Sequence, residues 1–159
     1  MLDSSFNAVE VLEMAKDIEE NGREFYNKYA AKADDPEFKQ LLEKLASDEK
    51  DHYETFAKLS TEVKENTGQE VDYVYDPEVS AYLEVLVEFT VFPPDRSFNL
   101  ENREEIIRHA IWAEKDSILL YQEMLANNKG ERTREVLKRL IKEEKKHLLD
   151  LLKYNDEKK

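Results

Sequence analysis

The sequence predicts an all-α protein, a four-helix bundle of two antiparallel helix hairpins joined by a long crossover that contains a short helix. Three observations lead to this fold class. Apolar residues recur at three- and four-residue intervals through four long segments. Short polar breaks separate the members of each pair of segments. The chain has only three Gly and four Pro, and a charged fraction of 38%, which is typical of long helices.

The four predicted helices span residues 5–33, 36–65, 100–128 and 131–154. Asp35 is the predicted N-cap of the second helix, and Pro36 is its predicted first residue. Gly130 separates the last two helices. Because both breaks are short, each pair of helices is expected to form an antiparallel hairpin. Residues 66–99 form the crossover, and the apolar run from Ala81 to Phe92 predicts its short helix.

The composition excludes several kinds of site and of binding partner. The 159 residues include 37 acidic and 24 basic side chains, for a formal net charge of -13, and no Cys. We expect one domain over residues 1–159. The missing Cys excludes disulfides, thiolate zinc sites and iron-sulfur centres. The acidic excess argues against nucleic acid and anionic membranes as partners. Without a signal peptide or a long apolar run, the expected location is cytoplasmic.

The two halves of the chain repeat each other when the first is shifted by 95 positions. The shift needs no gap, and it also places Gly22 on Ser117. The polar residues that coincide are Glu19 with Glu114, Tyr26 with Tyr121, Glu49 with Glu144, and His52 with His147. We therefore expect two similar hairpins related by an approximate two-fold axis.

Carboxylates interrupt the apolar stripe of every predicted helix at one level. An ionised carboxylate in an apolar interior is unfavourable by several kcal/mol unless it is paired or bound to a metal. No Lys or Arg lies on these stripes, so divalent cations are the remaining counter-charge. The candidate metal ligands are Glu19, Glu49, His52, Glu114, Glu144 and His147.

Spacing places these residues at one height. Glu19 lies 14 residues before Ala33, and Glu49 lies 13 residues after Pro36. At about 1.5 Å per residue, both lie roughly 20 Å from the turn that they share. The second hairpin repeats this spacing, and each His lies one turn beyond its Glu on the same helix face. Two hairpins packed face to face would bring four Glu and two His together.

A single Glu-x-x-His is a common surface pattern in a chain this rich in Glu. Two such pairs, both upstream Glu and both Tyr, all in register with apolar stripes, favour a site instead. His109 is interpreted as a non-ligand, because Ile106 stands three residues before it and Met14 is its counterpart in the first half. Packing or subunit contact is the interpretation of four further aromatic residues, Phe89, Phe92, Phe98 and Trp112.

The chain resembles the ferritin-like superfamily, and within it the rubrerythrins, over nearly its whole length. The segments that carry the resemblance are IEENGREFY, LASDEKDHY, AEKDSILLY and LIKEEKKHL. The resemblance implies two bound iron ions, with manganese or zinc as alternatives. It implies that Glu49 and Glu144 bridge the metals, that Glu19 and Glu114 are terminal ligands, and that His52 and His147 bind one metal each. It also implies that Tyr26 and Tyr121 donate hydrogen bonds to ligand carboxylates.

Two departures bear on activity. Rubrerythrins typically carry a further Glu where this chain has Ser117, and many end in a Cys-rich rubredoxin domain. The missing Glu argues against fast peroxide reduction, and the missing Cys implies that electrons come from an external donor protein.

The leading hypothesis is a non-haem di-iron oxidoreductase of oxidative stress. It would reduce peroxide or dioxygen at a small-residue opening beside Gly22 and Ser117. A non-catalytic bundle that sequesters or senses metal is the alternative, and a metal-free scaffold that binds partners through residues 66–99 is a third reading. We expect a homodimer rather than a storage shell.

Overall fold

The computed structural model describes residues 5–65, 74–88 and 100–159 and confirms the all-α class. Its helices are α1 (Ala8–Lys32), α2 (Pro36–Glu65), α3 (Pro77–Glu88), α4 (Arg103–Asn127) and α5 (Glu131–Glu157). None of the helices in this described part combines the length and apolar character needed to cross a bilayer.

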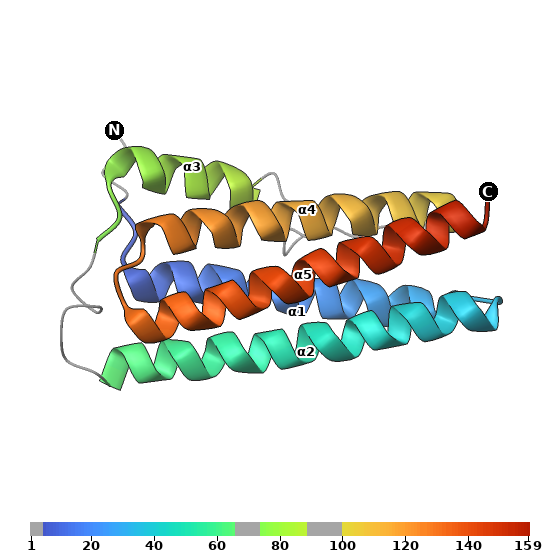
Figure 1. The fold of residues 1–159 in the computed structure, drawn as a ribbon, viewed down its shortest axis with the longest axis horizontal. Coiled ribbons are helices and arrows are strands. Elements are labelled where there is room, and N and C mark those ends of the chain that lie inside the picture. The colour runs from blue at the N-terminus through green and yellow to red at the C-terminus, as the bar shows by residue number, and fades with distance from the viewer. Residues whose placement is uncertain (1–4, 66–73, 89–99) are drawn as a thin grey trace.

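The helices form the two predicted hairpins (Figure 1). Helix α1 runs antiparallel to α2, and α4 runs antiparallel to α5, while α2 and α4 point in the same direction. Helix α3 lies outside this bundle and alongside α4. The crossover therefore returns the chain to the end of the bundle at which α2 began, as the parallel direction of α2 and α4 requires.

Capping residues explain why two long helices begin later than their predicted starts. The side chain of Asn7 accepts a hydrogen bond from the Glu10 N–H at 2.8 Å, so α1 begins at Ala8 rather than residue 5. Asn102 accepts from the Glu105 N–H at 2.9 Å, and α4 begins at Arg103 rather than residue 100. The predicted cap Asp35 accepts from the Glu37 N–H at 3.3 Å.

The short helix begins four residues before the apolar run that predicted it. Pro77 occupies its first position, and the Ser80 N–H donates to the Asp76 carbonyl at 2.8 Å. The prediction missed this start because the first turn, PEVS, contains no run of apolar residues. Residues 89–92 of the predicted run lie outside the described residues, as do Phe89, Phe92 and Phe98.

Within residues 5–65, 74–88 and 100–159, the core consists of two apolar clusters with a polar layer between them. One cluster, here the α3-end cluster, includes Leu12, Phe56, Leu83, Met124 and Leu137. The other is named the turn-end cluster after the turn between α1 and α2, and it includes Phe25, Phe38, Leu42, Ala110 and Tyr154. On each long helix, the carboxylate that interrupts the apolar stripe falls between the residues of one cluster and those of the other. The core thus positions a polar site midway along the bundle.

Candidate metal centre

The structure brings all six predicted ligand residues together in the polar layer. Each is at most 5% exposed. Their possible ligand atoms form two groups, and within each group the atoms lie within 4.8 Å of one another. The first group is Glu19, Glu49, His52 and Glu144, and the second is Glu49, Glu114, Glu144 and His147. Two potential ion positions therefore share the carboxylates of Glu49 and Glu144.

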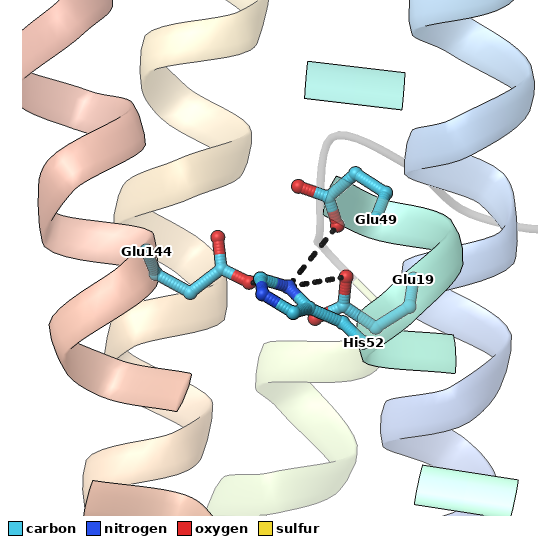
Figure 2. A group of neighbouring side chains, drawn as sticks. All are labelled: Glu19, Glu49, His52 and Glu144. Atoms are coloured by element: carbon cyan, nitrogen blue, oxygen red, sulfur yellow. Dashed lines mark ion pairs between the residues drawn. The ribbon is translucent and has the colours of Figure 1, made fainter. Parts of the chain in front are cut away.

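Figure 2 shows the first group, with side chains from α1, α2 and α5 converging on one point. His52 Nδ1 lies 2.8 Å from Glu144 Oε1, 3.4 Å from Glu19 Oε2 and 3.9 Å from Glu49 Oε2. The second group repeats the arrangement around the other imidazole. There, His147 Nδ1 lies 3.2 Å from Glu144 Oε2, 3.4 Å from Glu49 Oε1 and 3.6 Å from Glu114 Oε2.

Buried atoms without hydrogen bonds indicate that the cluster is built around a cation. The atoms concerned are Glu19 Oε2, His52 Nδ1, Glu114 Oε2 and Glu144 Oε1. His52 Nδ1 and Glu144 Oε1 are close, but they are not aligned as a donor and an acceptor. Among the described residues, no Lys or Arg forms an ion pair with the four carboxylates. Carboxylate oxygens and imidazole nitrogens suit iron, manganese or zinc.

Without a metal, protons balance the charge of the cluster. Burial, together with the negative charge of neighbouring carboxylates, raises the pKa of Glu49 and Glu144 well above the usual range. Burial alone would lower the pKa of His52, but its contacts with Glu144 and Glu19 raise it to about 12. The pKa of His147 is raised to about 11 in the same way by Glu114 and Glu144. Metal ions binding here would compete with these protons.

The two predicted tyrosines connect the hairpins across the layer. Tyr26 of α1 donates its hydroxyl to Glu114 Oε1 of α4 at 2.7 Å. Tyr121 of α4 donates to Glu19 Oε1 of α1. Both tyrosines are fully buried. Each therefore fixes the orientation of one carboxylate on the opposite hairpin, which leaves the second oxygen of that carboxylate facing the cluster.

Sequence reasoning missed two carboxylates that hold the histidines. His52 Nε2 lies 2.8 Å from Glu143 Oε2, and His147 Nε2 lies 3.0 Å from Asp48 Oδ2. A carboxylate that accepts from Nε2–H leaves the Nδ1 lone pair free for a metal. A signal was present, because an acid directly precedes the Glu of each Glu-x-x-His and the 95-residue shift aligns the two acids.

A groove between α2 and α5 reaches this layer from outside, and we call it the α2/α5 groove. It has a volume of about 410 Å³. Its outer lining includes Lys44, Asp48, Thr55, Arg139, Glu143 and Lys146. His52 and His147 also line it, so their Nε2 edges face the groove while their Nδ1 atoms face the cluster.

Other predicted features lie elsewhere. Gly22 is buried and Ser117 is 8% exposed, and the opening expected beside them stays a prediction. The α2/α5 groove lies on the opposite side of the bundle and reaches the ligands His52 and His147. His109 belongs to neither ligand group, and its Nδ1 lies 2.9 Å from the Glu105 carbonyl oxygen. Trp112 is 50% exposed and contacts the His109 ring, so it does not pack in the core.

Comparison with known proteins agrees with this geometry. The rubrerythrin family model matches residues 10–154. A Thermotoga maritima protein, designated a ferritin-like diiron-carboxylate protein, has a TM-score of 0.75 and 25% identity, and the match covers 99% of this chain and 100% of that one. A hypothetical protein from Pyrococcus furiosus has a TM-score of 0.67 and 25% identity, with 95% and 89% of the two chains covered. None of the curated proteins matches significantly.

Proposed function

Since the chain belongs to the rubrerythrin family, we propose that it is a non-haem di-iron oxidoreductase that reduces peroxide or dioxygen. The observation that carries this proposal is the pair of ligand groups that share Glu49 and Glu144. The designation of the similar Thermotoga maritima protein as diiron-carboxylate supports it. In this assignment Glu49 and Glu144 would hold both ions, Glu19 and Glu114 would hold one ion each, and His52 and His147 would each contribute Nδ1.

If the cluster held two iron(II) ions, these would supply the two electrons that, with two protons from solvent, reduce hydrogen peroxide to two water molecules. The chain itself contributes orientation and exclusion of solvent. Tyr26 and Tyr121 hold the terminal carboxylates, and Asp48 and Glu143 hold the imidazoles. The apolar clusters on both sides keep water away from the reacting centre. With no Cys in the sequence for an iron-sulfur relay, electrons return from an external donor protein.

Ser117 supports the alternative of a non-catalytic metal-binding protein. It lies in the polar layer, 8% exposed, where the resemblance to rubrerythrins leads one to expect a further Glu. A cluster without that carboxylate has one oxygen ligand fewer for a change of coordination during turnover. Metal loading without turnover would favour sequestration or sensing.

An anaerobic iron(II) titration followed by peroxide addition tests the proposal. We expect two iron ions per chain, and oxidation of both by one equivalent of peroxide. Glu144→Gln should abolish loading of the second ion, because Glu144 belongs to both groups. Glu54→Gln, at an exposed position of α2, is the matched control. Full loading without accelerated iron oxidation would support the non-catalytic alternative, and absence of metal binding would contradict both.

A further inference from the structure

Metal ions need a path from solvent to the buried cluster, and the ends of the bundle do not provide one. Apolar side chains of the α3-end and turn-end clusters fill the bundle on both sides of the polar layer. A divalent cation moving along the axis would lose its water without meeting an oxygen or nitrogen ligand. The path must therefore lie between helices, at the level of the layer.

Among the described residues, the other three pairs of neighbouring long helices pack more closely than α2 and α5 do. The helices within each hairpin contact each other more extensively than helices of different hairpins do. Between α1 and α4, the fully buried Tyr26 and Tyr121 are bonded to Glu114 and Glu19. The small residues Gly22 and Ser117 are buried on the same two helices. The described part of the bundle is therefore least closely packed between α2 and α5.

The α2/α5 groove fills that gap with polar groups. Asp48 and Glu143 are 34% and 45% exposed at their side chains, and each contacts the outer nitrogen of one imidazole. The inner nitrogen of His52 lies 2.8 Å from Glu144 Oε1. A single imidazole ring therefore separates the groove from the cluster on each side, and a carboxylate stands at the outer edge of each ring.

We infer that divalent metal ions enter the cluster through the α2/α5 groove. This inference rests on the proposed metal centre. Asp48 or Glu143 exchanges its contact with a histidine Nε2 for the incoming cation, and the released ring turns to let the ion pass. The cationic side chains of Lys44, Arg139 and Lys146 line the same groove. Their charge repels a cation, so they slow its entry.

Blocking the groove tests this inference. Cobalt(II) binding to the metal-free chain is followed by stopped-flow visible absorption, and its affinity is measured separately by equilibrium titration. Thr55→Trp should slow association at least tenfold while leaving the equilibrium affinity within about twofold. Thr61→Trp is the matched control, because both threonines donate to the carbonyl four residues earlier on α2, and Thr61 lies outside the groove.

Changing the charge at the groove is the second arm. Lys146→Glu should raise the association rate about threefold at 0.15 M salt, where charges beyond roughly 8 Å are screened. Lys145→Glu makes the same change on the preceding residue, outside the groove, and should have a smaller effect. Equal rates for both tryptophan variants, or equal effects of both charge reversals, would overturn this route and leave the metal centre standing. If the unmodified chain takes up no cobalt(II), both proposals fall.

Discussion

His52 and His147 use their two ring nitrogens for different purposes. The Nδ1 atoms face the shared carboxylates, while the Nε2 atoms are held by Glu143 and Asp48 of the opposite hairpin. An imidazole in this position keeps its orientation only while its outer nitrogen has an acceptor. The acids outside the cluster thus determine which nitrogen the metal meets.

Asp48→Asn should lower the equilibrium affinity for zinc by about 10–100-fold. An amide can donate to His147 Nε2 and so favour the tautomer with its proton on Nδ1, the atom that faces the cluster. Asp51→Asn is the matched control, because Asp51 also lines the groove on α2 but does not pair with either imidazole in the described structure. Isothermal titration of both variants measures the difference. Equal affinities would contradict a positioning role for Asp48.

Metal binding should release protons, so affinity should increase with pH. The pKa values of His52 and His147, raised to about 12 and about 11, mean that both imidazoles carry protons at neutral pH in the metal-free cluster. The raised pKa values of Glu49 and Glu144 favour the protonated carboxyl groups as well. Lowering the pH strengthens this competition, and raising it weakens it. The expected change is on the order of tenfold per pH unit for each proton displaced. Titrations between pH 6 and 8 would measure it, and a pH-independent affinity would contradict the assignment.

At the scale of elements, a polar contact connects α1 and α2 away from the metal cluster. Glu13 of α1 accepts from the Ser60 hydroxyl of α2 at 2.7 Å, and Lys16 and Lys64 lie within ion-pair distance. Hydrogen bonds from Lys16 and Ser60 lower the pKa of Glu13 to about 2. Ser60 is buried, so its hydroxyl depends on Glu13 for an acceptor within the hairpin.

Glu13→Gln should make the first hairpin less sensitive to acid. A carboxylate with a folded-state pKa of about 2 and an ordinary value of 4.5 stabilises the fold above pH 4.5 and loses that effect as the pH falls towards 2. The melting temperature of the metal-free wild type should therefore exceed that of the variant at pH 6 and converge with it near pH 2. Glu54→Gln on α2 serves as the control. A constant difference across this range would contradict the linkage.

The four long helices could be predicted because their apolar stripes are continuous and their breaks contain Pro36 and Gly130. The start of α3 could not, because Pro77–Ser80 has a single aliphatic residue, Val79, and is short enough to resemble a loop. The six cluster residues stood out because a carboxylate on an apolar stripe needs a partner.

Asp48 and Glu143 could not be separated from other acids by the same argument. They lie off the apolar stripes and are partly exposed, as many of the 37 acidic residues are. Their role depends on the opposite hairpin, since the histidines that they contact lie 91 and 99 residues away in the sequence. The groove could not be predicted either, because it depends on the distance between α2 and α5, and the sequence pattern of a single helix does not indicate that distance.

At the scale of the molecule, neither hairpin contains a full ligand group. The first hairpin supplies Glu19, Glu49 and His52, and its group is completed by Glu144 of the second. The second hairpin supplies Glu114, Glu144 and His147, and Glu49 of the first hairpin completes this group. A cation bound in either group would contact both hairpins, so metal binding opposes their separation. The expected homodimer stays a prediction, with exposed Trp112 and Leu119 available on α4.

The polar layer between the two apolar clusters also bears on folding cooperativity. Apolar packing that is continuous through a domain favours all-or-none unfolding. In the described part of this chain, buried carboxylates and imidazoles lie between the α3-end and turn-end clusters. In the metal-free chain, amide hydrogen exchange should therefore show two groups of protected amides with different opening free energies. Bound zinc should merge them into one. A single exchange class without metal would contradict this expectation, because it would mean that the protonated cluster already couples the unfolding of the two apolar clusters.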